Sequence, residues 1–545
     1  MKMEHCKIFL SLVILNACVS QNKNLVLGSH ILFLHTCTSY SHRVSSWPFI
    51  EALIAKGHQV TFIGPYEAKI PNKNVTDIVP KRLNALLNEL ISSNFDVTHR
   101  AYGLTPKFVM VYDYMCYTAC SEMLQSEEIQ SWLKSEPQID LIYSDTVTEC
   151  SYGLATKFKA KHGLILPVTF LSKYFDAYGV PLETSTIPDW DVTYKPPLSF
   201  LGRATGVIIP LVWRLSQILY YPWYKTLFEK YLGLDNISSL DDFQANTSLV
   251  LINGDFIEDY PRSLPPNVVK VPGLHVKARN GLNNKPVNKE LEAFISTKVN
   301  GTPSQGFFYI SFGTVAKGPN LPLEIRNKIF KTIESFPKLR FIWRWDGPNP
   351  DDYPKNLLFQ KWVEQEDLLG HPKIKGFITQ AGRPSMMEAF YNGVPTITFP
   401  ILGDQDFNAH RFETLGISIN LEIGDFTQED LTAAISKLVQ DTRYANKAKN
   451  LADFAKDTQF SPIDTAIWWT EFILRSSPEN LALLTPLGKS IFWFQRRDLD
   501  VWLFFGVIGL IWVKVGNAIL MFLYRKVCTR KAATNSRISK KDKSS

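Results

Sequence analysis

Residues 362–405, WVEQEDLLGHPKIKGFITQAGRPSMMEAFYNGVPTITFPILGDQ, decide the fold of this chain. A short apolar strand is expected at 376–379, followed by a tight glycine-containing turn at 380–382. A helix that begins near Pro384 ends at an Asn-Gly pair, and a second apolar strand is expected at 396–400. Strand, turn, helix and strand in this order predict a βαβ unit.

Such a unit places the turn and the helix N-terminus at the carboxyl edge of a parallel sheet. Free backbone N–H groups and the helix dipole attract a diphosphate there. Glu388 lies four residues past Pro384, so its carboxylate can face the same cleft and accept hydrogen bonds from a ribose diol. Trp362 offers a flat face on which a base can stack, and Gln365 lies three residues on. The stretch therefore predicts a nucleotide site.

The same stretch resembles the signature of the UDP-glycosyltransferases, the family that includes the UDP-glucuronosyltransferases. The residues that match at the family spacing are Trp362, Gln365, Asp367, Leu368, Leu369, Gly370, His371, Pro372, Phe377, Ile378, Thr379, Gly382, Glu388, Gly393, Pro395, Pro400, Asp404 and Gln405. The resemblance implies that Trp362, Gln365 and Glu388 hold uridine. It also implies that Thr379, Gln380 and Gly382 lie at the diphosphate, and that Asp404 and Gln405 hold sugar hydroxyls.

The turn departs from the family pattern, which commonly has His-Gly-Gly after the Thr and an Asn at the start of the helix. Gln380 can still donate to a phosphate oxygen, and Ala381 costs little unless its position needs a positive φ. Pro384 removes a backbone N–H where a diphosphate site would use one. Arg383 either compensates with a bidentate phosphate contact or is a solvated arginine, and we weigh the two equally. The first alternative predicts that Arg383→Ala weakens UDP binding several-fold.

A second βαβ unit is expected at residues 31–63, and its polar strand-to-helix loop ends at His42. The register HxxSxxPxxxALxxKGHxVT that begins at His42 resembles the start of the same family, which implies that His42 is the general base. His35 borders the same loop and is the rival candidate, whereas His58 follows the helix-ending glycine as a packing residue. Each of these rings can also be a histidine satisfied by neighbouring backbone groups.

A buried-type strand at 139–143 ends in Ser144 and Asp145. A carboxylate at the carboxyl end of a parallel strand faces the ligand edge. The resemblance implies that Asp145 orients His42 and stabilises its protonated form, as in a catalytic dyad. The alternative is a strand-end aspartate that caps the next helix.

Residues 194–228 are dense in aromatic and aliphatic side chains, and four prolines are expected to break them into short pieces. The segment can line an apolar acceptor pocket, lie against a membrane, or pack in the core. A strand at 249–253 then leads to Arg262, which in the family reaches the donor across the domain boundary; a hinge-surface arginine is the alternative.

The second domain opens with a strand at 306–311 and a turn similar to the family's Ser-x-Gly-Ser turn. Ser311, Gly313 and Thr314 can offer a hydroxyl and N–H groups to a phosphate. Alternating strands and helices on either side of a mid-chain linker predict an α/β protein with two Rossmann-like parallel-sheet domains facing a cleft. The resemblance implies the GT-B fold.

Both ends of the chain contain stretches typical of targeting and membrane-anchoring signals. Residues 1–20 are typical of a signal peptide, and residues 501–524 form an apolar stretch of about 36 Å as a helix, enough to span a bilayer despite Lys514. The tail at 525–545 holds eight basic residues and one acidic residue. The positive-inside tendency places it in the cytosol, and Lys541 and Lys543 resemble a dilysine retrieval signal of the endoplasmic reticulum.

The net charge of +7 lies entirely in this tail, because the remaining residues hold 51 basic and 51 acidic side chains. The folded body therefore gives no support for a nucleic-acid partner. Sequons at Asn74, Asn236, Asn246 and Asn300 agree with a luminal body. Four cysteines remain between the signal peptide and the tail, which allow one disulfide and make a zinc site improbable.

The expected domain boundaries follow from these features. They are 1–20 for the signal peptide, 21–270 for an N-terminal acceptor-binding domain, 271–455 for a C-terminal UDP-sugar-binding domain, 456–498 for helices that cross back, 499–524 for a transmembrane helix and 525–545 for a basic cytosolic tail. The expected topology is single-pass type I in the endoplasmic reticulum membrane, with the catalytic domains in the lumen.

The resemblance implies an inverting transferase that moves a hexose or hexuronic acid from a UDP-sugar to a hydroxyl of a small lipophilic acceptor. UDP-glucose and UDP-glucuronate both remain open as the co-substrate, no permanent cofactor or metal is expected, and a homo-oligomer is compatible with the sequence. The alternative is a non-catalytic relative that binds lipophilic ligands. A glycosidase, which needs two carboxylates flanking one bond, is disfavoured by the nucleotide-site register.

Overall fold

A computed structural model describes residues 28–541 except 69–70, 95–99, 103–107, 147–148, 191–193, 283, 299–302, 315, 486–490 and 493. The expected signal peptide, Asn300 and part of the dilysine motif lie outside the described residues. The chain divides into two compact units, Met1–Thr485 and Pro486–Ser545. We call the first unit the body.

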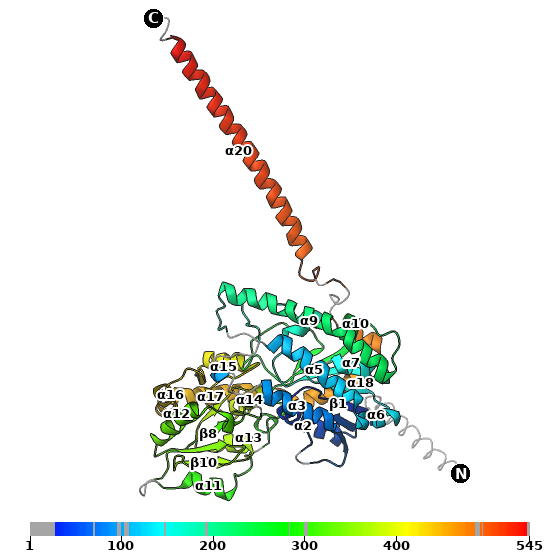
Figure 1. The fold of residues 1–545 in the computed structure, drawn as a ribbon, viewed down its shortest axis with the longest axis vertical. Coiled ribbons are helices and arrows are strands. Elements are labelled where there is room, and N and C mark those ends of the chain that lie inside the picture. Colours follow the sequence, from blue (N-terminus) through cyan, green and yellow to red (C-terminus); the bar gives the residue numbers. More distant parts are fainter. Residues whose placement is uncertain are drawn as a thin grey trace, which may run out of the picture. The chain divides into compact units, whose positions relative to one another are not determined.

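The first half of the body is built on a seven-stranded parallel sheet with the strand order β3-β2-β1-β4-β5-β6-β7 (Figure 1). Its strands are β1 (His30–Leu34), β2 (Gln59–Ile63), β3 (Val75–Ile78), β4 (Leu141–Ser144), β5 (Lys161–Leu166), β6 (Thr247–Ile252) and β7 (Val268–Lys270). Leu34 pairs with both Ile63 and Ser144, so three strands end at one edge of this sheet. We call the sheet and its helices the N-lobe.

Helices cover both faces of the N-lobe sheet, because its central strands are apolar on both sides. The helices are α2 (Tyr40–Ala55), α3 (Lys81–Asn94), α5 (Phe108–Gln125), α6 (Glu127–Lys134), α7 (Glu149–Phe158), α8 (Phe175–Tyr178), α9 (Phe200–Leu232) and α10 (Leu240–Ala245). Side chains of α5, α7 and α9 share one core cluster, and those of α2 share a second one with the opposite face of the sheet.

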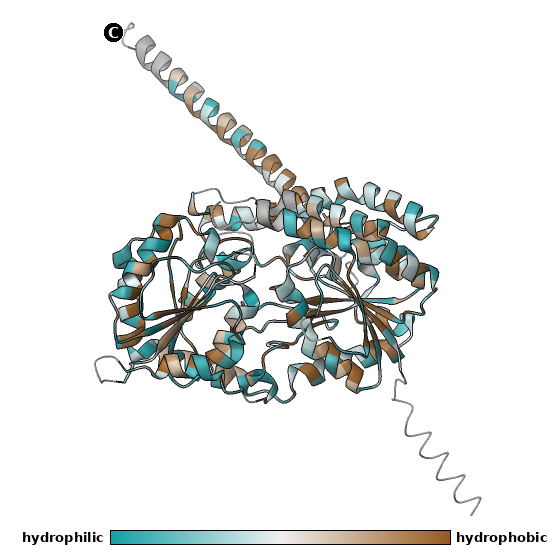
Figure 2. Cartoon of the chain, turned by 60° about the horizontal axis from the view of Figure 1, so that its bottom comes forward, coloured by the Kyte–Doolittle hydropathy of each residue, from teal (hydrophilic) through white to brown (hydrophobic). Residues whose placement is uncertain are grey.

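The second half, which we call the C-lobe, holds a six-stranded parallel sheet in the order β10-β9-β8-β11-β12-β13. Its strands are β8 (Phe307–Ser311), β9 (Arg340–Arg344), β10 (Leu357–Gln360), β11 (Ile374–Thr379), β12 (Thr396–Thr398) and β13 (Ser418–Asn420). Its helices are α11 (Lys289–Ser296), α12 (Leu323–Glu334), α13 (Gln365–Leu369), α14 (Arg383–Tyr391), α15 (Gln405–Thr414), α16 (Gln428–Gln440) and α17 (Thr442–Lys456). Figure 2 shows the strands of both sheets as hydrophobic interiors between helices. The predicted fold class of two parallel-sheet domains is confirmed.

After α17 the chain returns to the N-lobe through α18 (Pro462–Arg475), which is followed by α19 (Pro478–Ala482). Thr470 on α18 makes a hydrogen bond of 2.6 Å with the hydroxyl of Tyr143 on β4. The ammonium of Lys161 donates to the carbonyl oxygens of Ile473 and Leu474 at the end of α18, at 2.5 and 2.8 Å. A cation at a helix C-terminus satisfies carbonyls that the helix leaves open, so Lys161 fixes this return.

Helix α9 corrects one expectation. Residues 200–232 form a single helix with Pro210 and Pro222 inside it, whereas the prolines were expected to break the segment. A proline in a helix interior costs about 3 kcal/mol. Burial of Trp213, Tyr224 and Phe228 against the N-lobe core offsets that cost, which a local pattern does not reveal.

The N-lobe also contains two disulfides where the sequence analysis allowed one. Cys116 and Cys120 lie one turn apart on α5, so they share a face of that helix. Cys116 is bonded to Cys37 after β1, and Cys120 is bonded to Cys150 on α7. The bridges therefore tie α5 both to the loop that precedes α2 and to α7.

The second unit contains α20 (Leu499–Lys541). Within it, Leu499–Ala533 is the one helix in the described part of the chain that is long and apolar enough to cross a membrane. In the body, the three described sequons, Asn74, Asn236 and Asn246, are exposed.

Candidate active site

A cavity of about 560 Å³ lies between the lobes. The N-lobe lines it with the start of α2 and with Tyr112, Thr146, Val168, Leu171 and Trp190. The predicted site residues that line it are His42, Gly313, Thr314, Trp362, Gln365, Gln380, Gly382, Arg383, Glu388, Asp404 and Gln405. Its volume is in the range of pockets that hold small molecules.

His42 and Asp145 meet on the N-lobe side. Because β1 and β4 are adjacent and parallel, the segments after Leu34 and Ser144 leave the same sheet edge. His42 lies in the first turn of α2, which begins at Tyr40, and its Nδ1 is 2.7 Å from Asp145 Oδ2. The backbone N–H and the hydroxyl of Thr146 both donate to the other oxygen of Asp145. The carboxylate is therefore fixed in place beneath the imidazole.

The charges of this pair follow from their surroundings. Burial lowers the pKa of His42, but the charge of Asp145, their hydrogen bond and the charge of Asp404 outweigh it, so the pKa rises above its ordinary value. Burial raises the pKa of Asp145, but His42, His35 and Thr146 outweigh it and hold the pKa well below its usual range. Since Asp145 is a carboxylate that only accepts, Nδ1 of His42 carries a proton and Nε2 is left to accept one.

The two rival histidines occupy other environments. His35 is buried, and burial lowers its pKa to about 4. It lies 3.4 Å from Asp145 and does not line the cavity. The pKa of His58 is lowered, chiefly by burial, and its Nε2 lies 3.8 Å from Glu471 on α18. Neither ring faces the space where a substrate would lie.

The C-lobe turn after β11 holds Gln380 between two glycines. The amide nitrogen of Gln380 lies 2.2 Å from where a β-carbon on Gly313 would be, and 2.8 Å from that position on Gly382. The Oγ1 of Thr379 donates to the amide oxygen of Gln380 at 2.9 Å. The glutamine amide therefore packs closely against two backbone turns, and neither glycine has room for a side chain.

Ala381 has a φ of +68°, so the condition under which this departure from the family pattern becomes costly is met. The left-handed region costs a non-glycine residue roughly 1–2 kcal/mol. Ala381 is fully buried, and its carbonyl accepts a hydrogen bond of 3.0 Å from the amide of Asn408. Contacts with α14 and α15 hold the turn in this conformation.

Glu388 and Gln365 form a hydrogen-bonded pair on the cavity wall. The Gln365 amide donates to Glu388 Oε2 at 2.8 Å and to the hydroxyl of Ser385 at 2.9 Å. Burial raises the pKa of Glu388 to about 8, and the bond from Gln365 offsets only part of this. Trp362 is 41% exposed, and the guanidinium of Arg344 lies 5.0 Å from its ring. A flat indole face beside a carboxyl group can hold a nucleoside.

Arg383 is not the solvated arginine of the second alternative, and its hydrogen bonds go to the N-lobe and to Asn408. Its side chain is fully buried, and Nη1 donates to the carbonyl oxygen of Glu258 at 2.9 Å and to Asn408 at 3.4 Å. Its Nη2 lies 3.8 Å from the Glu258 carboxyl group and close to Gly254, where a β-carbon would be 2.6 Å away. The guanidinium joins the lobes chiefly through the backbone carbonyl of Glu258, a partner 125 residues away that the sequence of the turn does not indicate.

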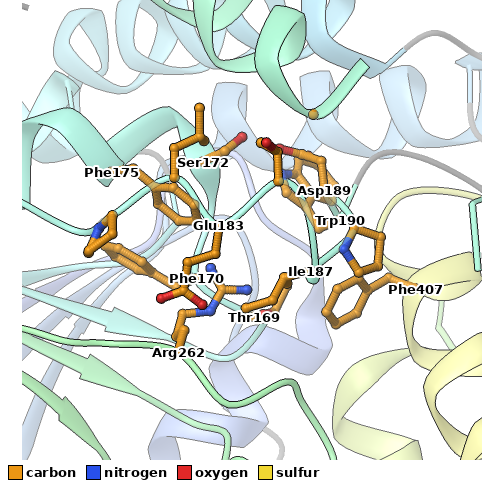
Figure 3. A pocket seen from close by; sticks show the side chains of 15 residues that line it. Thr169, Phe170, Ser172, Phe175, Glu183, Ile187, Asp189, Trp190, Arg262 and Phe407 are labelled. Atoms are coloured by element: carbon orange, nitrogen blue, oxygen red, sulfur yellow. The ribbon is translucent and has the colours of Figure 1, made fainter. Parts of the chain in front are cut away.

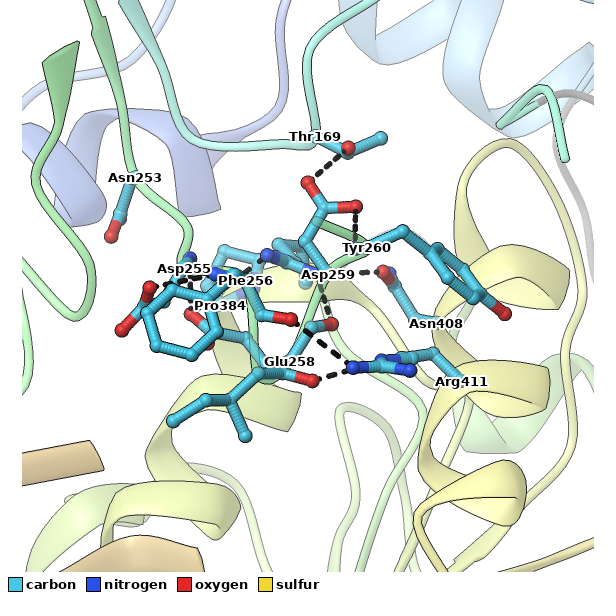
Figure 4. Close-up of polar contacts among 12 residues, drawn as sticks. Thr169, Asn253, Asp255, Phe256, Glu258, Asp259, Tyr260, Pro384, Asn408 and Arg411 are labelled. Carbon is cyan, nitrogen blue, oxygen red and sulfur yellow. Dashed lines mark hydrogen bonds and ion pairs between the residues drawn. The ribbon is translucent and has the colours of Figure 1, made fainter. Parts of the chain in front are cut away.

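Figure 4 shows the same loop from 253 to 260 reaching α15. Arg411 donates to the carbonyl oxygens of Ile257 and Phe256 at 2.8 and 3.1 Å, and Asp259 accepts from Thr169 at 2.6 Å. The loop is therefore held by hydrogen bonds to both lobes, through Arg411 to the C-lobe and through Asp259 to the N-lobe.

Arg262 was expected at the donor, but it lines a separate cavity of about 20 Å³ with Glu183, Asp189 and Phe407 (Figure 3). That volume is little more than one water molecule needs. The guanidinium lies 5.1 Å from the ring of Phe175, and its charge lowers the pKa of buried Asp259. Ser311 and Thr379 are buried at the ends of β8 and β11 and do not line the large cavity. Ser311 and Thr379 make hydrogen bonds with Gly313 and Gln380, respectively, which do line the large cavity.

The sequence analysis missed four residues that bear on the cavity: Arg100, His275, Lys277 and Arg344. Arg344 ends β9 at the same sheet edge as Ser311, so the strand-end rule could have found it. His275 accepts from Asn253 at 3.1 Å and donates to the carbonyl of Pro384 at 3.3 Å, and burial lowers its pKa to about 4. No local pattern marks it.

Arg100, which follows α3 in the chain, makes four hydrogen bonds to the C-lobe. Its guanidinium donates to both oxygens of Asp406 at 2.6 and 2.9 Å, and to both oxygens of Glu422 at 2.9 and 2.6 Å. Asp406 follows Asp404 and Gln405 at the start of α15. In the part of the chain that the structure describes, no group of His, Cys, Asp and Glu side chains is placed to hold a metal ion.

Comparisons with known proteins identify the family and the fold. The family model described as "UDP-glucoronosyl and UDP-glucosyl transferase" matches residues 32–534. Human UDP-glucuronosyltransferase 1A1 is 28% identical over 472 residues, 85% of each chain, and human UDP-glucuronosyltransferase 1A4 is 31% identical over 397 residues, 71% of this chain and 69% of that one. A UDP-glucosyltransferase from Polygonum tinctorium shares the fold with a TM-score of 0.55 at 15% identity, covering 83% of this chain and 99% of the other.

The predicted family resemblance is confirmed by the match over residues 32–534. The family match supports the predicted transferase rather than the alternative of a glycosidase. This chain belongs to the UDP-glucuronosyl and UDP-glucosyl transferase family and is a glycosyltransferase.

Proposed function

We propose that this chain transfers a sugar from a UDP-sugar to the hydroxyl of a small lipophilic acceptor, with inversion at the anomeric carbon. One observation carries the proposal: His42, paired with Asp145, lines the same cavity as the predicted donor residues of the C-lobe. A base on one wall and a leaving-group site on the other is the arrangement that an in-line displacement requires.

In the proposed step, Nε2 of His42 takes the proton of the acceptor hydroxyl. The acceptor oxygen forms a bond to the anomeric carbon while the bond from that carbon to the β-phosphate oxygen breaks, and its electron pair leaves with UDP. Asp145 stabilises the imidazolium that forms, since its pKa is held far below neutrality. The step consumes no reactant apart from the two substrates.

The C-lobe residues take complementary roles in this proposal. Trp362 and Glu388 bind the nucleoside, and the backbone around Gly313 and Gly382 at the start of α14 faces the diphosphate. Gln405 accepts from the backbone N–H groups of Ile401 and Leu402 at 2.8 and 3.0 Å. Its amide NH₂ is therefore the group that can donate to a sugar hydroxyl.

The cations around the cavity favour a neutral hexose. Among the described lining residues, Arg43 pairs with Asp77 at 2.7 Å, Lys277 pairs with Asp367 at 2.6 Å, and Arg383 is held by the Glu258 loop. Within the same described residues Arg344 keeps an unpaired charge, but it donates to the carbonyl oxygen of Gly313 and lies 5.0 Å from the ring of Trp362, at the nucleoside and diphosphate end of the cavity rather than at the sugar. Glucuronate would bring a carboxylate that needs a free cation, so we favour UDP-glucose.

The N-lobe wall supports a lipophilic acceptor, because Val168, Leu171, Trp190 and Tyr112 line it. For localisation we propose a single-pass protein of the endoplasmic reticulum membrane with a luminal body. The apolar helix Leu499–Ala533, the basic tail and the exposed sequons support this topology.

The test is UDP release with UDP-glucose or UDP-glucuronate and one phenolic acceptor. We expect wild type to release UDP with UDP-glucose at least about tenfold faster than with UDP-glucuronate, since one unpaired buried carboxylate costs several kcal/mol. The His42→Ala variant should release almost none with either donor. Equal rates for wild type and His42→Ala would overturn the proposed mechanism.

A further inference from the structure

Helix α9 presents an uncovered apolar stripe on its outer face. Between Phe200 and Trp223, nine large apolar side chains are 39% to 78% exposed. Among them Leu201, Ile208, Leu215 and Leu219 recur at spacings of seven and four residues, which places them on one side of the helix. The stripe runs for about 34 Å along α9.

The stripe is opposite the face that α9 buries. Trp213, Tyr224 and Phe228 pack into the N-lobe core and are almost fully buried. Water-soluble proteins rarely expose a contiguous apolar surface of this size, and one bordered by polar residues marks an interaction site. Elsewhere in the described body, the exposed large apolar side chains are spread over separate elements.

Basic side chains border the stripe. Arg203, Arg214 and Lys225 follow one another at intervals of eleven residues, so they form a row along one edge of it, in which Arg214 is paired with Asp241 on α10 at 2.6 Å. Between Phe200 and Trp223 the helix carries no acidic side chain. Apolar side chains on one face with arginine and lysine at its border are typical of helices that lie in a lipid interface.

The covalent structure brings a bilayer within reach of the body. Residues 486–498, thirteen in all, separate the end of the body from the apolar helix that begins at Leu499. Fully extended, they span about 45 Å. When the apolar helix crosses a membrane, a linker of this length keeps the near edge of the body within about 45 Å of the lipid surface, which is less than the diameter of about 60 Å expected for a folded body of this length.

We propose that the outer face of α9 docks on the lipid bilayer, with the apolar stripe in the acyl boundary and the basic row at the headgroups. The buried face of the same helix reaches the cavity wall: the ring of Trp213 lies 6.3 Å from those of Tyr112 and Trp190, which both line the cavity. Docking therefore brings this wall within about one helix diameter, ~10 Å, of lipid. Delivery of acceptors from the bilayer rests on the proposed function; the docking itself does not.

The test measures lipid contact directly. The full chain carrying Cys528→Ser and Leu215→Cys is labelled with an environment-sensitive fluorophore and placed in phosphatidylcholine nanodiscs, one chain per disc. The matched control carries the label at Ala433→Cys, an exposed position on C-lobe helix α16. With acyl chains brominated, the label at 215 should lose about half of its emission, and the label at 433 should keep its emission.

A second variant separates docking from accidental proximity. Leu201→Glu with Leu219→Glu places two charges on the stripe, and both positions are more than half exposed, so the fold should tolerate them. In this background the lipid quenching at 215 should fall to the level of the control. Absence of quenching at 215 in the parent overturns the proposal, as does quenching that the two glutamates leave unchanged. A label at 215 whose emission indicates an apolar environment, but which brominated lipid does not quench, would be covered by protein and would also overturn the proposal.

Discussion

The two lobes build their walls of the cavity in different ways. The N-lobe supplies the pair of His42 and Asp145, beside Arg43 bound to Asp77, in a wall that is otherwise mostly apolar. The C-lobe supplies amides, backbone turns, the carboxyl groups of Glu388 and Asp404, and the guanidinium of Arg344. The contrast separates two tasks: changing the charge state of an acceptor requires a tuned pKa, whereas holding a nucleotide requires hydrogen-bonding geometry.

Apolar packing holds each lobe together, whereas polar contacts join the two lobes. Each lobe has its own apolar core, but three arginines make polar contacts between them: Arg100 with Asp406 and Glu422, Arg383 with Glu258, and Arg411 with the backbone of Phe256 and Ile257. Charged contacts across a boundary fix orientation more than they add stability. The following predictions test this division of labour, from the largest effect to the smallest.

The largest effect is expected at Asp145. Asp145→Asn should lower kcat by roughly 10³-fold, because the imidazolium loses its counter-charge and the ring its fixed tautomer. Asp145 raises the pKa of His42 against the effect of burial, so its loss lowers that pKa. Since the base acts in its neutral form, activity rises with pH through this pKa, and the acidic limb of kcat/KM should shift to lower pH in the variant. A pH–rate profile measures both.

The control for Asp145→Asn is equilibrium binding of UDP, which should stay unchanged. If the acidic limb remains in place or moves to higher pH, Asp145 does not set the pKa of the base. A matching loss of UDP affinity would mean that the substitution disturbs the C-lobe wall instead.

The next effect is expected between the lobes. Arg100→Lys keeps the charge but loses the forked contact with Asp406 and Glu422. We expect the KM for the UDP-sugar to rise about tenfold, which corresponds to roughly 1.4 kcal/mol, because Asp404 and Gln405 adjoin Asp406. The kcat should change less than about twofold, since the reactive pair lies in the N-lobe. Steady-state kinetics with varied donor measures the split.

Charge reversal tests the same contact. Arg100→Glu alone should weaken donor use further, and Arg100→Glu combined with Asp406→Lys should recover part of the loss, since the pair is then restored with its signs exchanged. A double variant no better than the single one would show that the contact does not position the donor site.

A smaller effect concerns the turn of the C-lobe wall. Ala381→Gly should raise the free energy of unfolding by about 1 kcal/mol, because glycine adopts a φ of +68° without steric cost. The matched control is Ala433→Gly in the exposed helix α16, which should lower it by a similar amount. Chemical denaturation measures both, and equal signs for the two substitutions would contradict the assignment of strain to Ala381.

No effect is expected from removing divalent metals. Backbone N–H groups at the start of α14 and around Gly313 are the groups proposed to meet the diphosphate charge. Excess EDTA should therefore leave UDP release within about 1.5-fold of the untreated rate. Strong inhibition that added Mg²⁺ reverses would contradict this part of the mechanism.

The structural elements predicted best from the sequence are those that consecutive residues determine. The expected βαβ unit corresponds to β11 (Ile374–Thr379), α14 (Arg383–Tyr391) and β12 (Thr396–Thr398), because glycine, proline and apolar runs act locally. The meeting of His42 with Asp145 was implied by the family resemblance, and the structure achieves it because the neighbouring parallel strands β1 and β4 end at the same sheet edge.

The failures all involve partners distant in the chain. Arg383 binds Glu258, 125 residues away, and Arg100 binds Asp406 across 306 residues, so neither contact leaves a local signal. Tertiary packing likewise keeps α9 continuous through two prolines and holds Ala381 at a positive φ. The contacts that join the lobes are therefore the part of the structure that could not be predicted from the sequence.

The most direct test of the division between the lobes is UDP binding by His42→Ala, measured by calorimetry beside its acceptor-dependent UDP release. The proposed mechanism predicts a Kd for UDP within about twofold of wild type and a release rate lower by about 10³-fold. A variant that still releases UDP at the wild-type rate, or one that loses UDP affinity in parallel with its activity, would contradict it.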